Sequence, residues 1–280
     1  MLRNSKIAFE FLEVTSLPVA RTFYEDVLGL AVVENQFNPP HERHGIVKYD
    51  AGDTIIALNL ADRAFDPRLT DSVLTFLLTD PQREARIYAE LQINGFRAPS
   101  APGGEFADAD GHRFAIRRFA GTLRPGEESL FMVNELQCEV DNLAACSAFY
   151  SQQLGLLLAD DLPGLPVRFA TGNIKLSLLE AGLKVRRRNG LLPVFYTRNI
   201  RQTAADLEAF GVPFPNPVRF SDIGGAVRFQ DPSGNSFCLY EPSAVSLTWD
   251  SGPKVRQIVD GGPEWAAPGA IPGLLSKWVV

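Results

Sequence analysis

Hydrophobic and polar residues alternate along several short segments of the chain, and stretches with helical spacing separate these segments. Alternation over 7–14 predicts a strand, and the pattern over 18–27, with Pro18 in its first turn and Gly29 after its end, predicts a helix. Three more short strands are expected at 31–34, 45–49 and 54–60. The N-terminal segment is therefore predicted to fold as one βαβββ unit.

The same order of elements is expected three more times along the chain. The expected strands and helices are 73–79, 82–93 and 113–118 in the second unit, 131–140 and 144–153 with strands up to residue 179 in the third, and 192–197, 201–210 and 236–241 in the fourth. The segment 121–129 contains Pro and Gly and is interpreted as a linker between domains. Pro and Gly are also frequent from residue 242 onward, which favours an extended tail that wraps a domain or reaches a partner.

Two blocks of sequence occur twice and support this duplication. The block FYEDVLGL at 23–30 returns as FYSQQLGL at 149–156, and DADGH at 108–112 returns as DPSGN at 231–235. A repeat of this length indicates that both halves of the chain have the same architecture.

Composition and charge limit the class of protein. The 280 residues suffice for two domains, and 45% hydrophobic with 21% charged residues is typical of a globular protein with a sizeable core. The net charge of -6 disfavours a nucleic-acid partner, and the basic run at 184–188 is interpreted as a solvated connector. No apolar run has the length of a membrane span, and the first residues lack the apolar region of a signal peptide. Three cysteines without regular spacing favour a reduced, cytoplasmic setting.

The four βαβββ units, together with the FYxxxLGL and DPxGN blocks, resemble the vicinal oxygen chelate superfamily, which includes glyoxalase I, bleomycin-resistance proteins, fosfomycin-resistance enzymes and extradiol dioxygenases. The resemblance covers about residues 5–243. It implies an α+β chain in which tandem βαβββ modules form two half-barrel domains, at 1–122 and 130–243, with a linker at 123–129 and an extended tail at 244–280. Because this scaffold hosts many chemistries, the fold does not define the function.

The resemblance also implies where a metal would bind. In the family, two modules form one cup, and His, Glu or Gln side chains from the first and last strands of the modules hold a divalent metal. The first ligand position lies fourteen residues before the Phe of the FY block, at Phe9 in the first half and Glu135 in the second. The other positions hold Val73, Ala115, Leu192 and Cys238, with Ser177 or Lys175 as a further one. Since Glu135 is the one customary oxygen ligand among them, no bound cofactor is expected. A divalent metal, with Glu135 as a ligand if any, is the alternative.

Two histidines outside these positions are a further candidate. His41 and His44 lie three residues apart in a Pro-rich loop, a spacing that can serve a metal. No nearby Cys or further His completes a ligand set, so a solvated loop is expected. His112 stands where the family has Asn in a tight turn, and a turn role is expected for it.

A ligand-binding face is expected on the second pair of modules. Strand alternation directs Glu135, Gln137 and Glu139 into the cup. The other candidate ligand-binding residues are Lys175, Ser177, Tyr196, Cys238 and Tyr240. Glu135 beside Lys175 could act as a general base if burial raises its pKa; the alternative is a satisfied polar residue in a groove. Cys238 is expected to be a small buried residue rather than a nucleophile.

The first cup is predicted to be more apolar. Phe9 and Phe11, with Arg113 and Arg117 beside them, could hold a flat anionic ligand. Plain core packing is the alternative for the two phenylalanines.

These features together predict a protein that binds a small organic molecule in a concave cup without the family's metal triad. One alternative is a lyase, isomerase or hydrolase that uses Glu135 as its base. A second is a metal-dependent extradiol dioxygenase or glyoxalase with an atypical site, and a third is an interaction module that acts through the tail. Neither nucleic acid nor a membrane is an expected partner, and a homodimer is compatible with the sequence.

Overall fold

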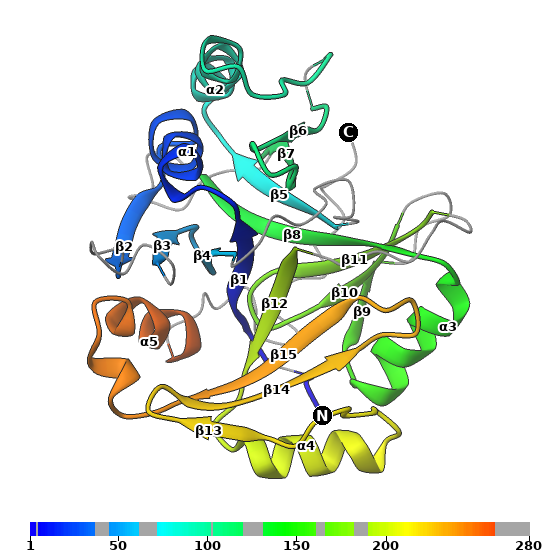
Figure 1. The fold of residues 1–280 in the computed structure, drawn as a ribbon. Coiled ribbons are helices and arrows are strands. Elements are labelled where there is room, and N and C mark those ends of the chain that lie inside the picture. Colours follow the sequence, from blue (N-terminus) through cyan, green and yellow to red (C-terminus); the bar gives the residue numbers. More distant parts are fainter. Residues whose placement is uncertain are drawn as a thin grey trace.

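The computed structural model describes residues 1–3, 5–36, 45–61, 72–101, 103–119, 131–160, 166–181 and 190–260, and its four modules follow one another along the chain (Figure 1). The first module contains β1 (Ile7–Val14), α1 (Leu17–Arg21), a π-helical turn (Thr22–Val27), β2 (Ala31–Asn35), β3 (Ile46–Asp50) and β4 (Ile55–Leu60). The second contains β5 (Ser72–Leu78), α2 (Pro81–Ile93), β6 (Phe106–Ala107) and β7 (Arg113–Arg118). The third contains β8 (Phe131–Val140), α3 (Leu143–Ala148), a π-helical turn (Phe149–Gln153), β9 (Leu157–Asp160), β10 (Val167–Ala170) and β11 (Lys175–Glu180). The fourth contains β12 (Leu191–Tyr196), α4 (Ile200–Ala209), β13 (Arg219–Ser221), β14 (Gly224–Gln230) and β15 (Ser236–Pro242). A 3-10 turn (Ser246–Thr248) and α5 (Gly252–Asp260) follow. The expected α+β class is confirmed.

The two repeated blocks contact each other in the core, which explains why they recur together. The hydroxyl of Tyr24 donates to Asp108 Oδ2 at 2.9 Å, and the hydroxyl of Tyr150 donates to Asp231 Oδ2, also at 2.9 Å. His112 lies in the turn of the first block pair, with Nδ1 2.7 Å from Asp108 Oδ2, as expected for a turn role. Each tyrosine thereby joins the helix of one module to the turn of the next.

The two sheets do not follow this pairing of neighbouring modules. One sheet has eight strands in the order β13-β14-β15-β12-β1-β4-β3-β2, and the other has seven in the order β6-β7-β5-β8-β11-β10-β9. The first module therefore shares its sheet with the fourth through β1 and β12, where Phe9 lies opposite Val194. The second module shares its sheet with the third through β5 and β8, where Thr75 lies opposite Glu135.

The expectation that successive modules form one cup is thus wrong. Every module offers the same row of backbone N–H and C=O groups along the free edge of its first strand. Periodicity predicts these strands but does not predict which module's first strand pairs with which. The domain boundaries at 1–122 and 130–243 remain predictions from the sequence. The linker predicted at 123–129 lies outside the described residues.

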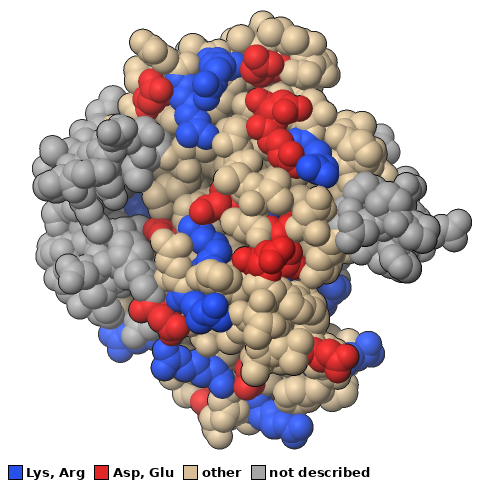
Figure 2. Space-filling model, turned by 90° about the vertical axis from the view of Figure 1, so that its left-hand side faces the viewer, with Lys and Arg blue, Asp and Glu red and all other residues tan. Residues whose placement is uncertain are grey.

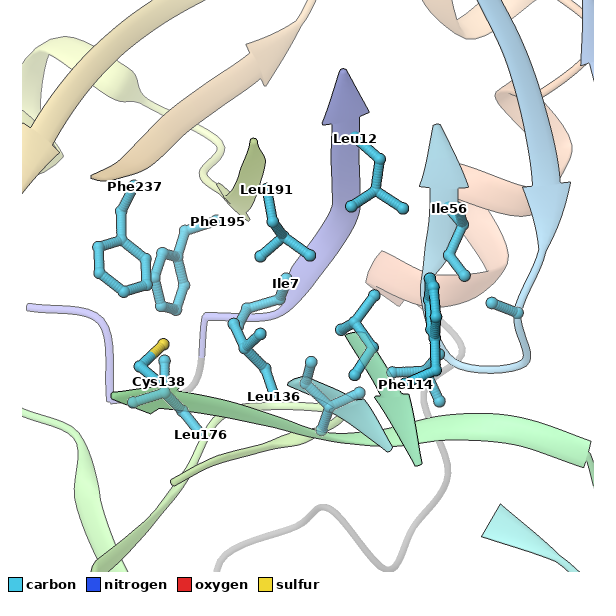
Figure 3. Packing of buried hydrophobic residues seen from close by; sticks show 14 of the residues in the cluster. Ile7, Leu12, Ile56, Phe114, Leu136, Cys138, Leu176, Leu191, Phe195 and Phe237 are labelled. Carbon is cyan, nitrogen blue, oxygen red and sulfur yellow. The ribbon is translucent and has the colours of Figure 1, made fainter. Parts of the chain in front are cut away.

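Apolar side chains from both sheets meet in one large cluster, and this contact fixes the inner face of each sheet (Figure 3). Leu136 and Cys138 of β8 point toward the same cluster as Phe195 of β12 and Phe237 of β15. Because side chains alternate along a strand, the residues between them lie on the opposite face of each sheet. We call this opposite face the outer face.

Helix α5 covers the outer face of the eight-stranded sheet (Figure 1). Val255 and Ile258 of α5 pack on a small apolar cluster that includes Phe9, Ala57 and Val194. The carboxylate of Glu34 accepts hydrogen bonds from Lys48 Nζ at 2.8 Å and from the backbone N–H of Ser251, just before the helix, at 3.1 Å. The side chain of Ser251 also donates to Glu34.

This helix differs from the extended tail expected at 244–280. Val255, Ile258 and Val259 have the spacing of one helix face, a pattern that the surrounding Pro and Gly residues obscured. The residues 261–280 lie outside the described part of the chain. None of the helices in the described residues is long and apolar enough to span a membrane.

Candidate functional site

The candidate ligand-binding residues divide between the two sheets. Glu135, Gln137 and Glu139 lie on the outer face of β8, and Lys175 and Ser177 lie beside them on β11. Tyr196 of β12, with Cys238 and Tyr240 of β15, lies on the outer face of the eight-stranded sheet. The single expected site is therefore two separate surfaces.

An arginine–glutamate cluster, formed by Glu135, Arg117 and Arg168, lies on the outer face of the seven-stranded sheet. Arg117 Nη1 is 2.8 Å from Glu135 Oε2, and Arg168 Nε is 3.2 Å from Glu135 Oε1. Glu135 is only 2% exposed and Arg168 is buried, but 44% of the Arg117 side chain is exposed. Each oxygen of the carboxylate thus has its own guanidinium partner, and one of these partners is within reach of a ligand.

Neighbouring strands repeat this arrangement. Arg113 Nη1 is 2.8 Å from Glu139 Oε1, and the same guanidinium bridges to Glu105 at 2.7 Å. Since β5 lies between β7 and β8, Arg113 and Arg117 reach from β7 across β5 to the carboxylates of β8. The outer residues of β5, among them Thr75, are buried beneath them. Two arginine–carboxylate pairs therefore cross the boundary between the second and third modules.

The raised pKa that a role of Glu135 as general base would require is not found. Burial alone would raise this pKa, but the positive charges of Arg117 and Arg168 outweigh burial, so the pKa lies below the usual value of a glutamate. Lys175 lies opposite Glu135 in the strand register, yet the ion pairs of the carboxylate are with arginines of β7 and β10. Glu135 is therefore an ionised, arginine-bound carboxylate near neutral pH.

Sequence reasoning missed Arg168 and placed Arg117 in the other cup. Alternation on β10 directs Phe169 into the core and Arg168 outward, so this signal was available. The contact of Arg117 with Glu135 was not, because it depends on which modules share a sheet.

The outer face of the eight-stranded sheet has a different character. Cys238 is 7% exposed in the apolar cluster that α5 covers, and burial raises the pKa of its thiol to about 11. The hydroxyl of Tyr240 donates to the carbonyl oxygen of Ile223 at 2.6 Å. Lys48 Nζ lies 5.7 Å from the ring centroid of Phe9. Helix α5 thus packs on the outer surface that the first module forms together with the fourth.

Charges on the surface are mixed in sign. On the face shown in Figure 2, Lys and Arg side chains are interspersed with Asp and Glu, without a continuous basic stripe. A nucleic-acid-binding face concentrates basic residues, and this face does not have that pattern.

Paired βαβββ modules that share a sheet are the arrangement that the resemblance to the vicinal oxygen chelate superfamily implies. Residues 133–239 match the model of the glyoxalase/bleomycin resistance protein/dioxygenase superfamily. This match confirms, over residues 133–239, the resemblance that the repeated blocks carry. A comparison with curated proteins found no match.

Solved structures extend the likeness of fold over nearly the whole chain. A proposed dioxygenase from Bacillus subtilis subsp. subtilis strain 168 superposes with a TM-score of 0.66 at 13% identity, covering 94% of this chain and 92% of that chain. Glyoxalase I from Zea mays superposes with a TM-score of 0.64 at 16% identity, covering 90% of this chain and 96% of that chain. At these identities the likeness establishes the fold and not the activity.

The residues present do not fit the divalent metal that the superfamily implies. The ligand positions that the resemblance implies lie on the outer faces of the two sheets. They hold Glu135, Val73, Ala115 and Ser177 on the seven-stranded sheet and Phe9, Leu192 and Cys238 on the eight-stranded sheet. Glu135 binds two guanidinium groups, whose charge repels a cation. Within the described ranges, no three His, Cys, Asp or Glu side chains are grouped as metal ligands. His41 and His44 lie outside those ranges.

Proposed function

We propose that the protein binds a small organic anion on the outer face of the seven-stranded sheet, without a divalent metal. The observation that carries this proposal is the arginine–glutamate cluster, in which Arg117 and Arg168 take both oxygens of Glu135. A carboxylate held in this way positions its arginines instead of coordinating a cation.

The chemistry of the face favours an anion with an apolar part. A guanidinium group has five N–H donors in a planar fork, so Arg117 can bind Glu135 and still offer donors to a carboxylate or phosphate. Val73, Leu77 and Ala115 lie buried on the same outer face, so the surroundings of Arg117 are apolar. A few convergent polar groups on an otherwise apolar surface are the usual form of a small-molecule site.

The names of the relatives are compatible with this proposal. The superfamily includes bleomycin resistance proteins, and the resemblance to that branch implies binding of an organic molecule without a metal. The low pKa of Glu135 argues against the alternative, an enzyme with Glu135 as general base, because a carboxylate bound to two arginines accepts a proton weakly.

Calorimetric titration with benzoate, cinnamate and phenyl phosphate, and with benzamide as the uncharged counterpart, tests the proposal. Arg117→Ala should weaken binding of the anions by at least about tenfold, since hydrogen bonds to charged groups contribute about 1.5–3 kcal/mol. Arg86→Ala removes an exposed arginine from α2 and serves as the matched control for net charge. Binding that is equal in Arg117→Ala and the wild type, or equal for benzamide and benzoate, would contradict the proposal.

A further inference from the structure

A pocket of about 380 Å³ opens where the N-terminal segment, the end of β12 and the last turn of α5 meet. Among the described residues that line it, Arg3, Lys6 and Arg198 are cationic and none is acidic. Tyr196 and Val259 line it as well. The volume lies in the range of small-molecule sites, and the charges give the pocket a clear electrostatic preference for anions.

Backbone hydrogen bonds fix the wall that carries two of these cations. The N–H of Leu2 donates to the carbonyl oxygen of Leu154 at 2.8 Å, and the Leu2 side chain is fully buried. The N–H of Gly172 donates to Ser5 O at 2.9 Å, and the N–H of Tyr196 donates to Lys6 O at 2.9 Å. Arg3 and Lys6 therefore project from a segment that is held at both ends, which preorganises them for a ligand.

The acidic groups near the pocket compensate its charge only in part. Arg198 pairs with Asp260 at 3.1 Å, but both side chains are largely exposed, so this pair contributes little. Lys6 Nζ donates to the carbonyl oxygen of Ile258 at 2.5 Å, at the end of α5. Burial lowers the pKa of Lys6, while Asp53 and Asp260 oppose this effect. Burial disfavours the charged form of Lys6, and an anion in the pocket would stabilise that form.

We propose that this pocket is a second binding site, for a small organic anion whose carboxylate or phosphate lies among Arg3, Lys6 and Arg198. The apolar part of the ligand contacts Tyr196 and Val259. This site belongs to the eight-stranded sheet and is independent of the arginine–glutamate cluster on the other sheet. Because the last turn of α5 forms one wall, a bound anion holds α5 against the sheet.

Calorimetric titration at constant ionic strength with inorganic phosphate, phenyl phosphate, benzoate and benzamide tests this site. The double variant Arg3→Ala/Arg198→Ala should lose at least about tenfold in affinity for the anions that bind here, while Arg86→Ala keeps the wild-type affinity. The variant Arg117→Ala removes the other proposed site, so the binding that it retains belongs to this pocket. Phenyl phosphate and benzoate distinguish a phosphate from a carboxylate ligand.

Hydrogen exchange provides a second readout that does not depend on the affinity. In Arg117→Ala, saturating anion should slow amide exchange over 252–260, and the double variant on this background should show no slowing. The proposal is overturned if Arg117→Ala binds none of the anions, if benzamide binds as tightly as benzoate, or if the double substitution leaves the remaining binding unchanged.

Discussion

Glu10 is a buried carboxyl group in the core between the two sheets, and its replacement should stabilise the protein. Its side chain is 0% exposed, and neither oxygen has a hydrogen-bond partner among the described residues. It lies on the same face of β1 as Leu12, close enough to Cys138 to affect its pKa. A buried polar group without a partner costs about 1–3 kcal/mol. Glu10→Leu should therefore raise the free energy of unfolding by about that amount near neutral pH.

The gain should depend on pH in a defined direction. Burial raises the pKa of Glu10 well above its usual value, so the folded protein keeps a proton that the unfolded chain releases above about pH 4.5. The stability of the wild type consequently falls as pH rises from there toward the folded-state pKa, by at most about 1.4 kcal/mol per pH unit. Below that window the group adds no pH dependence.

Urea denaturation of the wild type, Glu10→Leu and Glu10→Gln at several pH values from about 5 to about 8 measures this effect. The benefit of the leucine should grow with pH, and Glu10→Gln should lose the same pH dependence while keeping an unpaired polar group. A leucine variant that is less stable than the wild type, or a benefit of equal size at both ends of the range, would refute the reasoning.

Three further predictions concern α5, a tight turn and Cys238. Lys48→Met leaves Glu34 buried without its ammonium partner, so we expect a loss of about 3–5 kcal/mol in urea denaturation and faster proteolysis of α5; unchanged proteolysis would show that this pair does not hold the helix. Gly224 has φ of 131°, and an added Cβ would lie 2.0 Å from Glu241 O, so Gly224→Ala should lower stability by at least about 1–3 kcal/mol, and an unchanged urea midpoint would refute the strain. Cys238, with its pKa raised to about 11, should resist iodoacetamide at about pH 8 until urea is added; rapid labelling of the folded protein, followed by mass spectrometry, would be evidence against its burial.

The repeated blocks and the strand periodicity were sufficient to predict the four modules. Each block is confined to one local turn, and the Tyr24–Asp108 and Tyr150–Asp231 contacts that join them are repeated in both halves. Patterns of this kind depend on residues that are close together in the sequence, so they can be recognised from the sequence alone.

The candidate site could be predicted only in part, because its partners come from distant strands. Alternation on β8 correctly separated Glu135 from Leu136. Arg117 reaches Glu135 through the antiparallel pairing of β5 with β8, whereas Arg168 lies on β10, in the same module as Glu135. Side-chain periodicity does not indicate that pairing, so Lys175 was the partner considered for Glu135, and the general-base interpretation depended on a raised pKa that the arginines prevent.

The C-terminal region shows a second limit. Composition over 242–280 indicated an extended tail, and the average over this long segment obscured a nine-residue helix with one apolar face. The apolar spacing of Val255, Ile258 and Val259 is a local signal, but the surface that it covers is assembled from two modules at opposite ends of the chain.

Binding measured before and after removal of metals tests the central claim most directly. The protein is titrated with phenyl phosphate and benzoate as purified and again after dialysis against a chelator, and its iron, manganese, nickel and zinc contents are determined in the same samples. Our account predicts that the protein contains no stoichiometric metal and that chelation leaves both affinities unchanged. It also predicts that Arg117→Ala lowers the affinity of the site on the outer face of the seven-stranded sheet. A stoichiometric metal whose removal abolishes binding would contradict it.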